Sequence, residues 1–172
     1  KSTKRLQNLT RKRNNRANDY IKKTARYIIN YCIANNIGTV VCGYNDDFKR
    51  SMNLGKITNQ QFTQISFGSL RETLAGLCER YGMQYIEQEE SYTSKASFWD
   101  KDEIPVYGDS KQHIFSGKRI KRGLYKTSSG ILLNADVNGA LNILRKSNVV
   151  SLSGLYSRGE LNTPVRIRVI KN

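Results

Sequence analysis

The 172-residue sequence has no run of about 18 apolar residues, the length that crosses a membrane as a helix. Its N-terminal region is basic and has no apolar core of the kind that a secretion signal requires. These absences argue against a membrane partner and against export, so we expect a cytoplasmic protein. There is also no internal repeat and no low-complexity tract, which excludes a solenoid.

Cysteine and histidine are scarce as well, with three of the first and one of the second. Cys32, Cys42 and Cys78 are far apart, odd in number and set in apolar segments, so neither a disulfide framework nor a zinc knuckle follows. We expect buried free thiols. His113 lies in a polar loop, where a surface or phosphate contact is a better interpretation than a catalytic base.

Acidic residues are outnumbered, with 14 Asp and Glu against 29 Lys and Arg, and the formal charge of +15 favours a polyanionic partner. Ten of the cations lie in residues 1–26, where Asp19 is the only acid. A second cluster lies in 117–123 and a third comprises Arg166, Arg168 and Lys171. We expect nucleic-acid phosphates as their counterions. The residues predicted to bind nucleic acid are Lys4, Arg5, Arg11, Lys12, Arg13, Arg16, Lys22, Lys23, Lys118, Arg119, Lys121 and Arg122.

An apolar share of 38% is enough to build one ordinary globular core. Apolar periodicity predicts a long helix over 3–35, and a β-branched run predicts a buried strand over 39–42. A capping box at Ser69 predicts the start of a second helix, and 83–88 reads as another strand. A strand, a helix and a strand in succession predict a parallel sheet and the α/β class.

Residues 89–129 are irregular and polar, which favours an insertion with small hairpins of its own. A strand over 130–133 and a short helix follow, and strict alternation over 165–169 predicts a half-exposed strand. The short helix is predicted to pack through Val137, Ala140, Leu141 and Leu144. The chain therefore divides into a basic helix with the first part of the main domain (1–88), the insertion (89–129), the closing strand and helix (130–146) and a tail (147–172).

Asp136 lies where the closing strand gives way to the helix. A carboxylate at that point can ligate a cation, held by the field of the helix N-terminus. Alternatively, Asn134 or Asp136 simply caps the helix. The spacing of the residues does not separate these two readings.

Residues 134–143 resemble the D-x-N-A-A-x-N-I signature of the RuvC-like nuclease domain in the TnpB (OrfB) family, transposon-associated relatives of type V CRISPR effectors. Arg11-Lys-Arg-Asn14 resembles the basic helix of that family, and Tyr92-Thr-Ser94 resembles the tract leading into its zinc ribbon. Residues 115–125 resemble one subgroup. These segments occur in the family's order and together cover residues 3–146.

The resemblance implies an RNase H-like (RuvC-like) mixed sheet with flanking helices, in which two or three carboxylates hold a pair of Mg²⁺ or Mn²⁺ ions. Asp136 matches the last of these acids. The implied activity is RNA-guided hydrolysis of DNA phosphodiesters, with guide RNA and target DNA as partners. A companion transposase and a nucleoid-associated place in a prokaryotic cell are also implied.

Two departures concern the family's other acids. The first acid precedes the basic helix, and the chain begins at Lys1 without a methionine. We therefore expect the sheet to be incomplete at its N-terminal strands and this chain alone to be inactive. The second acid is replaced by Gly43. Glu89 or Glu90 is the favoured substitute, of which strand alternation lets only one face inward, and Asp46 or Asp47 is the less favoured one.

The insertion resembles a zinc ribbon that has lost its ligands. Alignment places Ser97 and Asp100 at the first cysteine pair and Lys126 and Ser129 at the second, so a Cys₄ site is impossible and no zinc is expected. Packing is predicted to replace the metal. The side chains expected to supply it are Phe98, Trp99, Ile104, Val106 and Tyr125.

Two other functions compete with the nuclease. The first is a nuclease-inactive relative or fragment that acts by binding RNA or DNA, which Gly43 and the missing first acid favour. The second is a plain DNA-binding domain of a transposase. It explains the charge but not the segment around Asp136.

Overall fold

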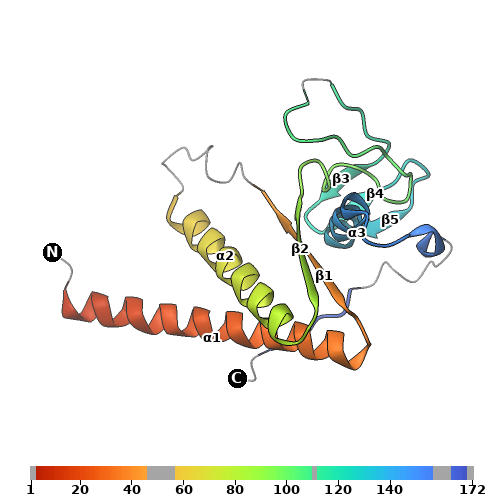
Figure 1. Ribbon diagram of the computed structural model, residues 1–172. Helices are drawn as coiled ribbons and strands as arrows, with labels where there is room; N and C mark the ends of the chain where they lie inside the picture. The colour runs from red at the N-terminus through yellow and green to blue at the C-terminus, as the bar shows by residue number, and fades with distance from the viewer. Residues whose placement is uncertain (1–2, 46–56, 110–111, 157–163, 170–172) are drawn as a thin grey trace. The chain divides into compact units, whose positions relative to one another are not determined.

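The computed structural model describes residues 3–45, 57–109, 112–156 and 164–169, with the side chains of 57–66 left undescribed. The elements are α1 (Lys4–Ala34), β1 (Thr39–Tyr44), α2 (Ile57–Arg80), β2 (Gln84–Glu89), β3 (Lys118–Lys121), β4 (Leu124–Lys126), β5 (Leu132–Asn134) and α3 (Ala135–Ser147) (Figure 1). The chain forms two compact units. The first comprises 1–40, 47–86 and 167–172, and the second 41–46 and 87–166. The four-part division of the sequence stays a prediction.

The long helix α1 confirms the prediction for residues 3–35. Its N-terminus is capped by Thr3, whose Oγ1 accepts a hydrogen bond from the Leu6 amide at 3.3 Å. Only the second half of α1 has a buried face. There Ala25 and Ile29 pack against Leu74 and Cys78 of α2, forming the core of the first unit. The first half is left exposed.

Helix α2 begins at Ile57, twelve residues before the capping box that the sequence offered as its start. Ser69 instead lies within the helix, where its carbonyl accepts a bond from Thr73 Oγ1 at 2.6 Å. The segment 57–68 contains no proline and one glycine, so nothing in it stops a helix. A capping signature marks only a possible start of a helix. The helix begins earlier when the residues before the signature can also adopt the helical conformation.

Strands β1 and β2 pair in parallel, as the strand–helix–strand order predicts. The Gln84 amide donates to the Gly38 carbonyl at 2.8 Å, and the Glu90 amide donates to that of Tyr44 at 2.9 Å. Both strands therefore run in the same direction, and their carboxyl ends lie together. Glu90 follows β2 at that end.

The second unit contains the antiparallel sheet β3–β4–β5 and helix α3. Its core includes the fully buried Tyr125 of β4 together with Leu133 and Ala135, and Trp99 packs against them. The sheet confirms that the irregular region carries a hairpin. The closing strand and helix also form close to their predicted bounds.

Three other predictions need correction. Residues 164–169 form no strand, because no other described strand pairs with them, and Val165 is 84% exposed. Helix α3 buries Asn138 and Asn142, whereas Ala140 on its apolar face is exposed. Val106 is 71% exposed and therefore does not supply the buried packing that was predicted.

Cys32 and Cys78 are buried free thiols, as expected, and Cys42 is half-buried. Burial raises the pKa of both Cys32 and Cys78. Among the described residues, no helix has the length and apolarity to cross a membrane.

Candidate functional site

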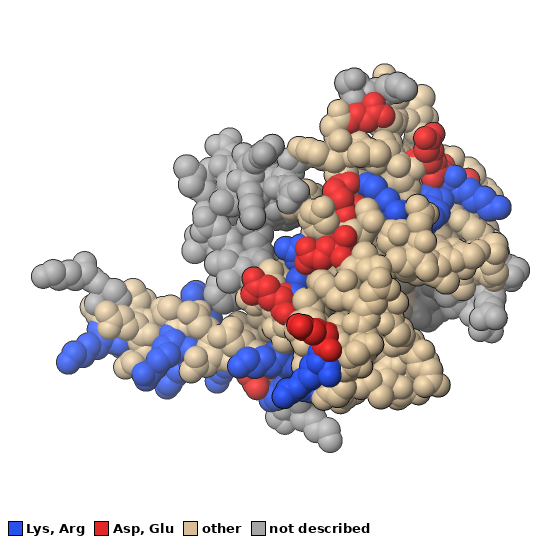
Figure 2. Space-filling model, viewed as in Figure 1, with Lys and Arg blue, Asp and Glu red and all other residues tan. Residues whose placement is uncertain are grey.

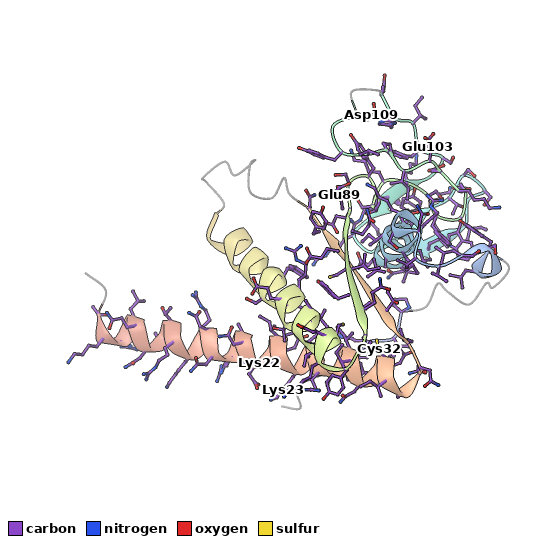
Figure 3. The ribbon with its side chains drawn as sticks, viewed as in Figure 1. Lys22, Lys23, Cys32, Glu89, Glu103 and Asp109 are labelled. Carbon is purple, nitrogen blue, oxygen red and sulfur yellow. The ribbon has the colours of Figure 1, made fainter. Side chains whose placement is uncertain are left out.

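The cations of α1 form an exposed basic surface. Residues 4–16 are exposed throughout, and so are Lys22 and Lys23 (Figures 2 and 3). Lys23 pairs with Asp19 at 2.8 Å, and Arg26 donates to the Tyr81 hydroxyl at 2.6 Å. With one acid among so many cations, the surface keeps a strong positive charge that an anionic partner can neutralise.

A second basic surface lies on the hairpin β3–β4, where Lys118, Arg119, Lys121 and Arg122 are all exposed. Arg119 brings this surface to the start of α3, because its Nη2 lies 3.9 Å from Oδ1 of Asp136. The structure thus joins two predicted groups, a nucleic-acid-binding cation and the carboxylate of the signature segment. A phosphate held by Arg119 would lie close to Asp136.

The start of α3 confirms the capping interpretation for Asn134, and a ligand role for Asp136 stays a prediction. Asn134 is the N-cap, and its Oδ1 accepts hydrogen bonds from the amides of Asp136 and Val137 at 2.9 and 3.0 Å. The Asp136 side chain is 85% exposed. Since Asn134 satisfies the helix start, the carboxylate of Asp136 is not used as a cap and can bind a ligand.

The side chains of Asn138 and Asn142, further along α3, point away from Asp136. Asn138 Oδ1 accepts from the Phe98 amide at 3.0 Å, and its Nδ2 donates to the Ala96 carbonyl at 2.8 Å. Asn142 Nδ2 donates to the carbonyls of Thr93 and Ala96 at 2.9 and 2.7 Å. These side-chain amides form hydrogen bonds with backbone groups of an irregular segment, which has no strand partner for those groups. They therefore fix the chain that follows Glu90.

Glu89 lies at the end of β2 (Figure 3), where it is held in an ion pair. Its Oε2 lies 2.6 Å from Lys146 Nζ, and its Oε1 accepts from the Ser91 amide at 2.5 Å. Burial raises the pKa of Glu89, but the hydrogen bonds from Lys146 and Ser91 outweigh it and leave that pKa below its usual value. Glu89 thus ties the end of β2 to the end of α3.

Glu90 lies against Gly43, the position where the family's second acid is absent. A Cβ built on Gly43 would lie 2.6 Å from Glu90 Oε2 and 2.8 Å from Ile143 Cδ1. The Glu90 carboxylate therefore occupies the space that a side chain at position 43 would enter. Because alternation puts Glu89 and Glu90 on different sides, only Glu90 meets Gly43.

Glu90 and Asp136 face one side of α3, but they are not adjacent. Ile143, which contacts the space at Gly43, follows Asp136 by two turns on the same helix face, about 10 Å along the axis. No group of three or more metal-ligating side chains is found in the part of the chain that the structure describes. Asp46 and Asp47, the less favoured substitutes, lie outside that part.

Hydrogen bonds join the segments where a ribbon would carry zinc. Asp100 accepts from the Ser128 amide at 3.0 Å and from its hydroxyl at 2.6 Å, while Ser97 Oγ accepts from the Asp100 amide at 3.2 Å. Burial raises the pKa of Asp100, but the bonds from Ser128 and Ser97 leave it below its ordinary value. Asp102 makes a similar link, accepting from the Ser116 amide and hydroxyl. Phe98 and Tyr125, both fully buried, add the expected packing.

Sequence reasoning missed the structural roles of Asn138, Asn142 and Lys146. Together with Arg145 they lie on one face of α3, at steps of four, three and one residues, and bind the segment 89–105. The spacing of the two asparagines by four residues was a visible signal. Their partners lie in irregular backbone that no sequence pattern marks, so the structure was needed to identify what they bind.

Comparisons with known proteins found two family models and a solved structure that resemble parts of this chain. A family model described as "Probable transposase" (OrfB_IS605) matches residues 1–49, and one described as "Cas12f1-like, TNB domain" matches 67–143. A chain in the cryo-EM structure of a Cas12f1–sgRNA–target DNA complex matches 86% of this chain at 20% identity, with a TM-score of 0.55.

The match covers 38% of that Cas12f1 chain, so the present chain corresponds to well under half its length. At this identity the likeness shows a shared mixed α/β fold. A comparison with curated proteins gave no match. Two family matches in succession, together with the shared fold, support a similarity of this chain to the TnpB-like relatives of the type V effectors.

Proposed function

We propose that the chain is the C-terminal, RuvC-like part of an RNA-guided DNA nuclease encoded by a transposon, with guide RNA and target DNA as its partners. The observation that carries the proposal is the contact between Arg119 and Asp136. An exposed carboxylate that does not cap its helix, next to a basic hairpin, suits chemistry on a phosphodiester. The match to a protein solved with sgRNA and target DNA supports the same class of partner.

The basic surface of α1 holds nucleic acid by its backbone. Its cations are exposed and almost without acids, and no base-reading motif is present among them. Such a surface suits a protein in which base pairing of the guide reads the sequence. The hairpin β3–β4 then holds a second stretch of backbone beside Asp136.

Asp136 and Glu90 are the proposed ligands of Mg²⁺ or Mn²⁺. Both are carboxylates on one side of α3, which fits the donor preference of Mg²⁺. When bound, the metal pair would activate water and stabilise the leaving oxygen. In this proposal Glu89, which pairs with Lys146, positions the strand end and is not a ligand.

Binding without cleavage is the second candidate function. It is favoured by the lack of a three-ligand group among the described residues and by the distance along α3 between Asp136 and Ile143. In that case the basic surfaces retain their role and Asp136 acts only as a neighbour of Arg119.

The test uses the full-length protein with its flanking noncoding RNA, Mg²⁺ and a guide-matched DNA. We expect Asp136→Ala to abolish cleavage and to leave DNA binding intact, whereas Glu103→Ala, at an exposed acid of the same unit, leaves both unchanged. Equal cleavage by wild type and Asp136→Ala would contradict the assignment of Asp136 as a metal ligand. Binding without cleavage by the wild type would establish the second function.

A further inference from the structure

A surface pocket of about 400 Å³ lies in the second unit, outside both basic surfaces. It is formed by the end of α3, the turn at 98–101 and the segment 150–156. Among the residues that the structure describes, its polar lining carries two cations, three hydroxyl groups and an amide, and no carboxylate. The residues are Lys101, Arg145, Asn148, Ser151, Ser153 and Tyr156.

An aromatic stack holds Lys101 at this pocket. The rings of Tyr156 and Phe98 stack with centroids 4.8 Å apart and planes 9° apart, and Lys101 Nζ lies 4.8 Å from the Tyr156 centroid. The Lys101 backbone has a φ of 59°, in the left-handed region that a residue with a Cβ seldom adopts. A strained backbone and an aromatic support both serve to keep this ammonium in place.

Arg145 is anchored on the other side of the pocket. Its Nη2 donates to the Asp102 carbonyl at 2.5 Å, and its Cζ lies 5.8 Å from the Phe98 centroid. This bond uses one of five N–H donors of the guanidinium, so others remain for a ligand. The field at the C-terminus of α3 favours a cation at Arg145, but it does not account for Lys101 in the turn.

We infer that this pocket binds a phosphodiester group of a nucleic-acid strand through Lys101 and Arg145, with Ser151 and Ser153 as hydroxyl donors. Two fixed cations with hydroxyls and no competing carboxylate fit a phosphate. The choice of a nucleic acid over another phosphate rests on the proposed function. The pocket would hold the strand at a third place, separate from α1 and β3.

Trp99 provides a local probe of this pocket. It is the only tryptophan in the sequence, and its ring meets that of Tyr156 edge-on at 6.2 Å. Its emission is to be titrated with a short single-stranded DNA that ends in hydroxyl groups, and separately with adenosine monophosphate. Because the signal comes from the pocket, strand binding at α1 or β3 does not produce it directly.

We expect a saturable change with the DNA strand that Lys101→Ala weakens roughly tenfold and Lys101→Arg restores. The matched control is Lys95→Ala, which removes an exposed ammonium that also lies over a tyrosine, Tyr92, at 5.7 Å. This control should change the affinity less than twofold. Thermal melting of each variant shows whether it remains folded.

If Lys101→Ala and Lys95→Ala weaken the affinity for the DNA strand equally, or if the strand gives no saturable signal, the pocket is not a phosphate-binding site. A response to adenosine monophosphate alone would overturn the nucleic-acid assignment. These outcomes are distinct from a failure of the proposed function, because binding by this chain requires neither guide RNA nor cleavage.

Discussion

The carboxylate of Glu90 fills the space beside the backbone of Gly43. Its Oε2 lies 2.6 Å from the point that a Cβ at position 43 would occupy. The loss of an acid from β1 and the presence of one after β2 are thus linked in space. This relationship supports the proposal that the carboxylate has moved from one strand to its neighbour, while the site keeps its charge.

The basic surface of α1 should bind nucleic acid with a strong dependence on salt. Replacing Arg11, Arg13 and Arg16 by alanine removes three phosphate contacts, so the slope of log affinity against log salt should fall by about 2 to 3. Fluorescence anisotropy with labelled RNA at several salt concentrations measures this slope. The triple replacement by lysine keeps the charge and should keep the slope, and a slope unchanged by alanine would contradict the electrostatic account.

Asn142 should contribute to stability well beyond an ordinary surface asparagine. Asn142→Ala leaves the Thr93 and Ala96 carbonyls without this donor in a buried setting, a loss of about 1–3 kcal/mol in the free energy of unfolding. Urea unfolding followed by Trp99 emission measures it. Asn30→Ala, at an exposed position of α1, is the control and should change little. Similar losses of unfolding free energy for the two variants would show that the hydrogen bonds of Asn142 do not stabilise the protein.

Tyr125 should make the second unit sensitive to alkali. Burial, aided by the charge of Asp102, raises the pKa of Tyr125 to about 12. Since the unfolded chain releases this proton near pH 10, the stabilisation is complete below that pH and is lost as the pH rises towards 12. Unfolding curves of wild type and Tyr125→Phe should converge over that range. Parallel curves would show that Tyr125 does not titrate with unfolding.

The irregular region should not depend on a metal for its stability. Asp100 and Asp102 join its segments through Ser128 and Ser116, where a ribbon would use zinc. We therefore expect the same melting temperature with and without a strong chelator. Asp100→Ala, in contrast, should lower it, because the Ser128 amide loses its acceptor. A fall in melting temperature with chelator, accompanied by zinc release, would reveal a bound ion instead.

The elements that the sequence predicted well are those with a strong period. The apolar face of α1 repeats at the spacing of a helix, so its local pattern and its burial agree. The β-branched run forms the strand β1, but that strand is half-buried where the sequence predicted a buried one. The long helix, the parallel pair and the closing helix follow from such patterns. Asp136 was singled out through the signature segment, and its role as a ligand stays a prediction.

Other features depended on what lies opposite in space. Asn134 and Asp136 are both good caps, and only the backbone geometry decides which of them accepts the amide bonds. From the sequence alone, Asn138 would be taken for a surface residue. The fold is needed to show that the Ala96 carbonyl lies against it. The alternating segment 165–169 lacked a partner, without which alternation makes no strand. The sequence predicted that an acid is missing at Gly43, but only the fold shows that Glu90 lies beside that residue.

The central claim, that Glu90 replaces the acid missing at Gly43, is tested by moving the carboxylate back. The two atoms nearest to a Cβ at position 43, Glu90 Oε2 and Ile143 Cδ1, are ends of flexible side chains. The space can therefore accept Glu at position 43 once Glu90 is trimmed and the end of Ile143 shifts. The measurement is guide-directed DNA cleavage by the full-length protein carrying Glu90→Ala, with and without Gly43→Glu. We predict that Glu90→Ala loses cleavage and that adding Gly43→Glu restores part of it. Wild-type cleavage by Glu90→Ala alone would contradict the account.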